Sequence, residues 1–142
     1  KRQPISIPLG TMIETPRAAL IAGDLAPLVD FMSFGTNDLT QMTYGFSRDD
    51  VEASVIKKYI EMDILQESPF AQLDALGVGK LVQEAISSSR AINPEIKIGI
   101  CGEHGGDPTS IRFLANSGVD YVSCSPPRIP IARLVCAQES LK

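Results

Sequence analysis

Short apolar segments alternate with helical segments along this chain, and that alternation restricts its possible folds more than any other feature. Four apolar segments have the length and character of buried strands: residues 5–14, 31–34, 97–101 and 120–123. Helix-forming stretches follow at 18–28, 78–91, from Asp107-Pro108 onward and from Pro130 to about Gln138, with a longer, partly helical stretch after the second strand. Strands that alternate with helices predict a parallel sheet covered by helices.

Two α/β architectures accommodate four such units, an open doubly wound sheet and a portion of a (β/α)₈ TIM barrel. The glycines after the third strand do not form the GxGxxG pattern of dinucleotide-binding sheets, and the phosphate-binding GxxxxGK[ST] sequence is absent. A complete barrel takes about 250 residues. Four units in 142 residues therefore correspond to half of a barrel, and we expect one domain over residues 1–142.

Composition excludes several classes of function. The net charge is −4 and no run of lysine or arginine is present, so we expect no nucleic-acid partner. Three cysteines without CxxC spacing predict neither a disulfide framework nor a zinc site, and favour a reducing compartment. No apolar run approaches the ~18 residues that span a bilayer. Residues 1–4 do not lead into a signal peptide and the chain lacks an initiator methionine, so we expect a fragment of an intracellular protein.

Polar residues follow each of the four predicted strands. Glu14 ends the first, residues 35–38 follow the second, 101–106 the third and 123–125 the fourth. Ligands of barrels and open α/β sheets bind at the carboxyl ends of the strands. Four consecutive units with polar groups at this end predict a binding site there.

Glu14 and Asp38 are the first candidate pair. Two carboxylates that end neighbouring strands repel each other unless a cation or a proton lies between them. Carboxylate oxygens suit Mg²⁺, which completes its shell with water and substrate oxygens. The alternative is that Glu14 pairs with Arg17 and that Asp38 caps a helix.

The sequence Gly35-Thr36-Asn37-Asp38 predicts a turn from strand to helix. Glycine permits close approach of the backbone, and the free N–H groups of a helix start favour an anion. Asn37 could donate a hydrogen bond to a substrate oxygen. Plain helix capping by these residue types is the alternative.

Cys101 ends the third strand and enters a glycine-rich turn that would leave its thiol accessible. A thiol beside an enolate can act as a general acid, whereas most free cysteines are small buried hydrophobes. His104 either supports Cys101 or is a hydrogen-bonded loop residue, and we favour the second role. Cys124 and Cys136 are interpreted as packing residues. The arginines near the last two units, and Arg48, are expected to be solvated or ion-paired: Arg112, Arg128 and Arg133.

Several ordered motifs together resemble the phosphoenolpyruvate (PEP)-utilising enzyme family. They are residues 10–16 (GTMIETP), 33–41 (SFGTNDLTQ) and 99–103 (GICGE). Residues 42–50 (MTYGFSRDD), 101–106 (CGEHGG) and 120–126 (DYVSCSP) are most similar to the dikinase members of that family. The resemblance covers about residues 7–138. It implies that the chain is the C-terminal half of the family's PEP/pyruvate-binding (β/α)₈ barrel.

The resemblance also implies residue roles. Glu14 and Asp38 would ligate Mg²⁺ and hold PEP or the pyruvate enolate. Gly35, Thr36 and Asn37 would line the substrate, with Asn37 hydrogen-bonded to it.

Cys101 would be the proton donor at the methylene carbon. The implied reaction interconverts ATP, pyruvate and phosphate with AMP, PEP and diphosphate through a phosphohistidine on a swivelling domain. The ATP-grasp and phosphohistidine domains, and the first half-barrel with its substrate arginines, are not in this sequence. The complete enzyme is expected to be a homodimer in the cytoplasm, or in the plastid if it comes from a plant. PEP synthase, the phosphotransferase-system enzyme and a non-catalytic half-barrel that binds a partner through its open sheet edges are the alternatives.

Overall fold

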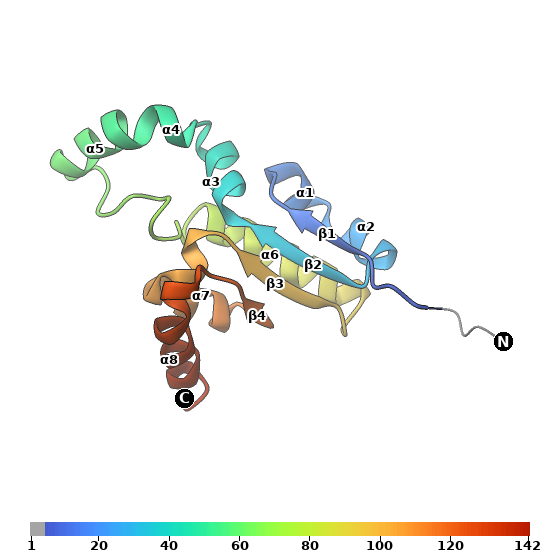
Figure 1. Cartoon of the computed structure of the whole chain (residues 1–142). Coiled ribbons are helices and arrows are strands. Elements are labelled where there is room, and N and C mark those ends of the chain that lie inside the picture. Colours follow the sequence, from blue (N-terminus) through green and yellow to red (C-terminus); the bar gives the residue numbers. More distant parts are fainter. Residues whose placement is uncertain (1–4) are drawn as a thin grey trace.

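A single parallel sheet organises the chain in a computed structural model that describes residues 5–142 (Figure 1). Its strands are β1 (Gly10–Ile13), β2 (Phe31–Gly35), β3 (Lys97–Cys101) and β4 (Tyr121–Val122), and their order in the sheet is their order in the sequence. Residues 1–4, which bear on the expected absence of a signal peptide, lie outside the described part.

Helical segments connect and follow the strands. Between β1 and β2 lie α1 (Pro16–Leu20), α2 (Ala22–Leu25) and the 3₁₀ turn η1 (Ala26–Leu28). Between β2 and β3 lie α3 (Thr36–Tyr44), α4 (Arg48–Val51), the π-helical turn η2 (Glu52–Ile56), α5 (Lys57–Glu61) and α6 (Val78–Ile92). After β3 come the 3₁₀ turn η3 (Glu103–Gly106) and α7 (Pro108–Asn116), and after β4 the 3₁₀ turn η4 (Pro126–Arg128) and α8 (Ile129–Glu139).

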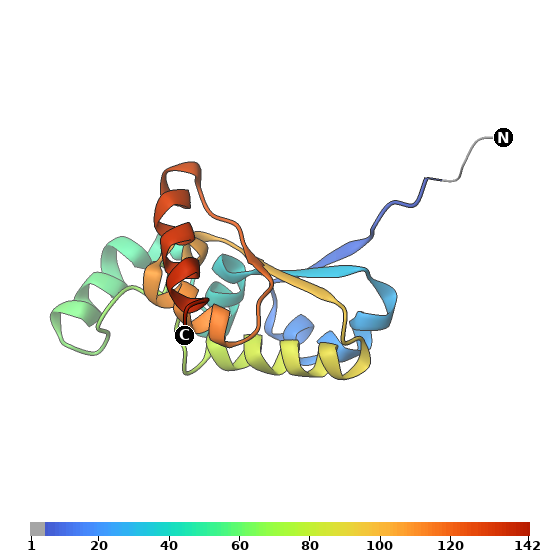
Figure 2. The ribbon, with the colours of Figure 1, turned by 90° about the horizontal axis from the view of Figure 1, so that it is seen from below.

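Helices cover one face of the sheet and leave the other face of β1–β3 open (Figure 2). Alternate strand residues point to the covered face, where Ile13, Phe34 and Ile100 are buried against the helices. On the opposite face Met12 is 44% exposed and Tyr121 42% exposed. A complete barrel would enclose this open face as its interior, because helices surround the outside of a barrel.

The strand order distinguishes between the two architectures left open by the sequence. A doubly wound sheet reverses its strand order at a switch point, whereas barrel strands follow one another around the sheet. The β1-β2-β3-β4 order of the described residues has no reversal. The predicted α/β fold is confirmed, and it is consistent with half of a TIM barrel.

Two helix starts form as the sequence predicts. Thr15 precedes Pro16 and its hydroxyl accepts the Ala18 N–H at 3.0 Å. Asp107 precedes Pro108 and its carboxylate accepts the Ser110 N–H at 2.7 Å. Both side chains satisfy N–H groups that lack partners inside the helix.

Other boundaries differ from the prediction. The helix expected over 18–28 is three short pieces, because the chain leaves helical geometry at Ile21 and has Pro27 in its last turn. The first strand covers only Gly10–Ile13, and the exposed residues before it pair with no strand. The fourth strand is reduced to Tyr121–Val122, which pairs with β3 on one side only. No helix within residues 5–142 is long and apolar enough to cross a membrane.

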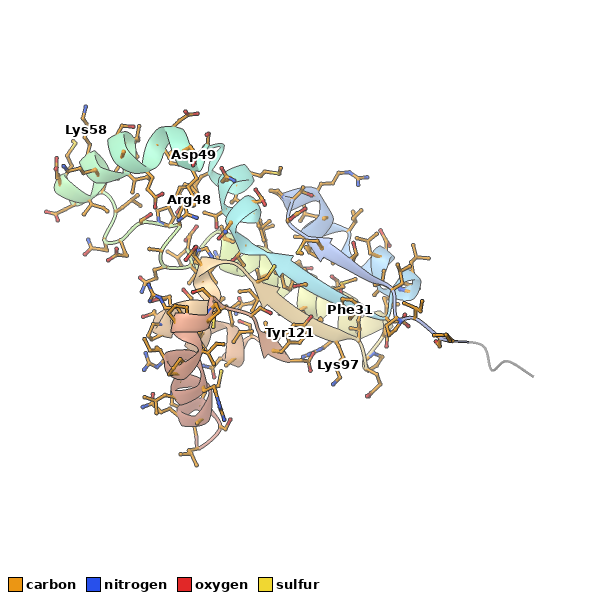
Figure 3. All side chains as sticks on the ribbon, viewed as in Figure 1. Phe31, Arg48, Asp49, Lys58, Lys97 and Tyr121 are labelled. Carbon is orange, nitrogen blue, oxygen red and sulfur yellow. The ribbon has the colours of Figure 1, made fainter. Side chains whose placement is uncertain are left out.

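The long stretch between β2 and β3 forms an arm that extends from the body of the molecule (Figure 1). The arm consists of α4, η2 and α5, and the chain then returns through residues 62–77 to α6. Arg48 lies at the base of the arm, with its guanidinium carbon 5.8 Å from the centre of the Phe70 ring, and Lys58 points away from the arm's far part (Figure 3). This contact holds the returning chain against the base of the arm.

Gly105→Ala is expected to lower the free energy of unfolding by about 3 kcal/mol. A Cβ at Gly105 would overlap the backbone carbonyl of Ser123, which cannot rotate away. Gly106→Ala is the matched control, since its Cβ would meet the side chain of Arg128, which is exposed and can move. Denaturant unfolding of both variants tests this, and equal losses would contradict the backbone explanation.

Candidate functional site at the carboxyl ends of the strands

Glu14, Gly35 and Cys101 form one row across the open face at the carboxyl end of the sheet. Gly35 pairs with Cys101 in the β2–β3 register, and Ile13 pairs with Phe34, so Glu14 follows opposite Gly35. Neighbouring strands are 4.7–4.9 Å apart, which puts the backbones of Glu14 and Cys101 roughly 10 Å from each other. An acid and a thiol therefore flank the one residue of the row that has no side chain.

The absence of a side chain at Gly35 gives the Glu14 carboxylate its place. A Cβ at Gly35 would lie 2.8 Å from both Cβ and Oε2 of Glu14. The carboxylate thus lies over the Gly35 backbone, and any larger residue would displace it. Sequence reasoning had assigned Gly35 to substrate lining, and the structure adds this contact with Glu14.

Asn37 is oriented by the chain that follows Cys101. Its Oδ1 accepts the Glu103 N–H at 3.2 Å. A backbone N–H can only donate, so this contact assigns the oxygen and leaves both hydrogens of Nδ2 for another acceptor. The amide is therefore presented as a donor, as its expected role at a substrate oxygen requires.

Asn37 and Cys101 line the same open cavity of about 270 Å³. Residues that follow β3 and β4 form the rest of its wall: Gly102, Glu103, Gly106, Ser123, Cys124, Ser125 and Arg128. Two predicted site residues, one from β2–α3 and one from β3, are brought together here. Glu14 and Asp38 are not part of this wall.

The Cys101 thiol is half-buried at the edge of the cavity. Its Sγ lies 3.5 Å from the Phe34 carbonyl oxygen and 3.7 Å from Sδ of Met12. Cys101 lies on the open face, whereas its neighbour Ile100 is fully buried on the covered face. The thiol is consequently available to a ligand on the open side of the sheet.

Asp38 and Glu14 have the donor chemistry of a magnesium site. Asp38 is exposed in the first turn of α3, and its Oδ1 accepts a hydrogen bond from Gln41 Nε2 at 2.9 Å. Within residues 5–142 neither carboxylate takes part in an ion pair, so the alternative Glu14–Arg17 pair is not formed. Asp38 is not the N-cap of α3, because Gly35 occupies that position.

Two carboxylates fit Mg²⁺, which needs only one or two from the protein. The described part of the chain contains no group of three or more histidine, cysteine, aspartate or glutamate side chains able to hold a metal. The remaining positions around Mg²⁺ would therefore belong to water and substrate oxygens.

Thr36 and His104 are buried beneath the cavity, and both are 0% exposed. His104 Nδ1 lies 2.8 Å from Thr36 Oγ1, and Nε2 lies 2.9 Å from the Pro69 carbonyl oxygen. Burial lowers the pKa of His104 below its ordinary value, and the nearby Arg48 charge acts in the same direction, against smaller opposing effects of the Pro69 carbonyl, Asp107 and Glu103. The prediction that His104 is hydrogen-bonded is confirmed, and the structure adds that the ring is buried in the core.

Arg128 is the cavity residue that sequence reasoning missed. Its side chain packs over Gly106 and lines both the 270 Å³ cavity and a neighbouring cavity of about 290 Å³ that also contains Arg48. Arg48 pairs with Glu52 at 3.1 Å and Arg112 with Glu139 at 3.7 Å, as expected of ion-paired arginines. The sequence carries no signal for Arg128, because its place depends on how η4 folds over η3.

The other two cysteines have different positions. Cys136 packs in α8 against the small cluster of Ile111, Ala132 and Val135, in agreement with its interpretation as a packing residue. Cys124 also contacts this cluster, but it lies after the end of β4 and lines the 270 Å³ cavity. No disulfide links the three free thiols.

Comparison with known proteins places this geometry in a family. The family model described as "PEP-utilising enzyme, PEP-binding domain" matches residues 1–141. The chain is 57% identical over 138 residues to "Pyruvate, phosphate dikinase 1, chloroplastic" of Arabidopsis thaliana, which covers 97% of this chain. It is 58% identical over 130 residues to "Pyruvate, phosphate dikinase, chloroplastic" of Flaveria pringlei, and 58% identical over 134 residues to "Pyruvate, phosphate dikinase 2" of Zea mays.

These matches cover nearly all of the chain and a small part of each relative. The match amounts to 92% of this chain for the Flaveria protein and 94% for the Zea protein. The chain spans 14% of the length of the Arabidopsis and Flaveria proteins and 15% of the Zea protein.

Proposed function

The chain belongs to the PEP-utilising enzyme family as a part of its PEP-binding domain, and from this we propose that it is the enolate-handling half of the PEP/pyruvate site of a pyruvate, phosphate dikinase. The proposed reaction of the complete enzyme interconverts ATP, pyruvate and phosphate with AMP, PEP and diphosphate. Within it, this chain binds the three-carbon substrate and moves one proton.

The observation that carries the proposal is the row of Glu14, Gly35 and Cys101. A carboxylate and a thiol face the same open side of the sheet across a glycine, next to the Asn37 amide. A three-carbon acid is small enough to contact both the Glu14 carboxylate, which lies over Gly35, and the Cys101 thiol on the next strand. The 57–58% identity to dikinases supports this choice of substrate class.

Each residue has a defined task in this proposal. Mg²⁺, held by Glu14 and Asp38, would supply positive charge that stabilises an enolate oxygen. Asn37 donates from Nδ2 to a substrate oxygen, and Gly35 lines the substrate. Thr36, which was expected to line it as well, is buried and supports the site from behind through its hydroxyl. Cys101 donates the thiol proton to the methylene carbon to form the pyruvate methyl group, and its thiolate takes a methyl proton back in the reverse direction.

The direct test is exchange of the pyruvate methyl protons with solvent deuterium by the full-length protein that contains this segment. We expect Mg²⁺-dependent exchange, because Cys101 protonates and deprotonates the same carbon. NMR of pyruvate measures the loss of methyl proton signal. A full-length protein without any exchange in the presence of Mg²⁺ would rule out the proposed function.

The chain of 142 residues is expected to form no PEP from ATP, pyruvate and phosphate by itself. The proposal assigns ATP binding, the phosphohistidine and the substrate arginines to ATP-grasp, phosphohistidine and first half-barrel regions beyond this sequence. Coupled measurement of AMP and PEP tests the prediction, with the full-length protein as control. PEP formation by the chain alone would contradict it.

Two alternatives can be separated by experiment. PEP synthase and the phosphotransferase-system enzyme share the proposed site, but only a dikinase consumes phosphate and releases diphosphate with ATP and pyruvate. A non-catalytic half-barrel would bind a partner at its open sheet edges without proton exchange. We propose a homodimer in the cytoplasm, or in the plastid if the source is a plant; two of the relatives named above are chloroplastic.

A further inference from the structure

His104 is a buried group to which the proposed function gives no task. Its ring bridges two segments far apart in the sequence, the Thr36 hydroxyl at the start of α3 and the Pro69 carbonyl of the chain returning from the arm. The Thr36 hydroxyl also lies 3.2 Å from the Cys101 carbonyl oxygen. A chain of polar contacts therefore runs from Pro69 through His104 and Thr36 to the peptide that follows the thiol residue.

The chemistry of the partners determines where the protons are. The Pro69 carbonyl can only accept, so Nε2 of His104 carries a hydrogen and donates it. In the neutral ring Nδ1 has no hydrogen and accepts from the Thr36 hydroxyl. That hydroxyl has one hydrogen and cannot donate to the Cys101 carbonyl at the same time.

Protonation of His104 would reverse the direction of this contact. Nδ1 would then donate to Thr36 Oγ1, and the Thr36 hydrogen would turn to the Cys101 carbonyl oxygen. The Cys101–Gly102 peptide thus has two hydrogen-bonding states, and the protonation state of the His104 ring selects between them. Gly102 has φ +121°, a backbone conformation open to glycine alone, so the turn after Cys101 has little steric support of its own.

We propose that His104 is a positioning residue: by accepting the Thr36 hydroxyl hydrogen it keeps that hydrogen off the Cys101 carbonyl, and so fixes the position of the Cys101–Gly102 peptide and of the Cys101 thiol against the substrate. This inference rests on the proposed function, because the thiol has a task only if Cys101 moves the proton. The neutral ring, with Thr36 donating to Nδ1, is the competent state.

Two amide variants of the full-length protein separate the two contacts of the ring. In His104→Asn the amide oxygen takes the place of Nδ1 and can accept from Thr36, while the contact with Pro69 is lost. In His104→Gln the amide nitrogen reaches the place of Nε2 and can donate to Pro69, while the acceptor for Thr36 is lost. We expect His104→Gln to lower kcat for pyruvate proton exchange by about tenfold to a hundredfold with little change in KM. His104→Asn retains most of the activity.

Thr36 provides a second route to the same test, in case either histidine variant does not fold. Thr36→Val removes the hydroxyl at nearly constant volume, and Thr36→Ser keeps it. We expect Thr36→Val to lose less exchange than His104→Gln, because valine places no hydrogen on the Cys101 carbonyl, and the His104→Gln/Thr36→Val double variant to exchange faster than His104→Gln alone. Thr36→Ser keeps both contacts and is the control. Non-additivity of this kind identifies residues that act through one contact.

The pH dependence of exchange gives a readout that a purely structural role would not change. The charged groups near the ring are Arg48 at the start of α4 and Glu103 and Asp107 at the ends of η3, and burial dominates, so the pKa of His104 lies below its usual value. Lowering the pH through that pKa protonates the ring and is expected to slow exchange in the wild type. His104→Asn stays uncharged between about pH 5 and pH 8, and we expect this acid inflection to disappear.

If the wild type exchanges protons, equal kcat losses in His104→Asn and His104→Gln would overturn the inference but not the proposed function. An unchanged acid inflection in His104→Asn would do the same. A wild type that exchanges no protons would overturn the proposed function, and the inference with it. The two failures are therefore distinguishable.

Discussion

Cys101→Ser in the full-length protein is expected to slow exchange of the pyruvate methyl protons by about 10²- to 10⁴-fold, the range attributed to a positioned general acid. A serine hydroxyl fills nearly the same volume at the end of β3 but is a far weaker acid than a thiol, so it cannot return the proton. Formation of the phosphohistidine from ATP and phosphate is expected to continue, because that step does not involve the methylene carbon. NMR of pyruvate and trapping of the phosphorylated protein measure the two steps separately.

Cys136→Ser is the matched control, since Cys136 is also half-buried but packs in α8 away from the cavity. Its exchange rate is expected to stay near that of the wild type. Normal exchange in Cys101→Ser would remove this thiol from the mechanism. Loss of both partial reactions in that variant would mean that the substitution disturbs the fold instead of the proton transfer.

Glu14→Gln and Asp38→Asn are each expected to lower the exchange rate by about a hundredfold at a fixed Mg²⁺ concentration. Removal of a residue that only supports a metal ligand already costs about 10- to 100-fold, and loss of the ligand itself should cost at least as much. Each amide keeps the size of the side chain and removes its negative charge, which is what attracts Mg²⁺. Excess Mg²⁺ is expected to restore part of the rate. Titration of the exchange rate with MgCl₂ measures the shift.

Asp24→Asn is the control for this pair, because Asp24 is an exposed carboxylate on α2, behind the covered face of the sheet. It should leave the Mg²⁺ dependence unchanged. A Glu14→Gln protein with the Mg²⁺ titration of the wild type would exclude Glu14 as a ligand. The same result for Asp38→Asn would exclude Asp38 as a ligand.

The sequence predicts the sheet and the end of it that carries the site, because these depend on local patterns. Short apolar segments identify the strands, and the residue that follows each strand must lie at its carboxyl end. Glu14, Gly35 and Cys101 were therefore found without any knowledge of their contacts. Their alignment in one row follows from the strand register, which the pattern alone does not specify.

Long-range contacts account for what the sequence did not predict. His104 meets Thr36 and Pro69 only because the chain returns from the arm beside η3, and no periodic pattern encodes that return. Arg128 reaches the cavity because η4 passes over Gly106. The contact of Asp38 with Gln41 depends on the first turn of α3 and not on the strand before it, so the pattern of strands does not predict it.

The order of the strands in the sheet has a consequence for how the chain acquires its structure during synthesis. Each strand pairs with the one translated before it, so β2 can join β1 as soon as the short α1–α2 connection has left the ribosome. Between β2 and β3, however, residues 36–96 must be made first. Met32 and Phe34 therefore wait for Ile98, Ile100 and α6 with their apolar side chains only partly covered. The nascent chain is most exposed to premature association during that interval.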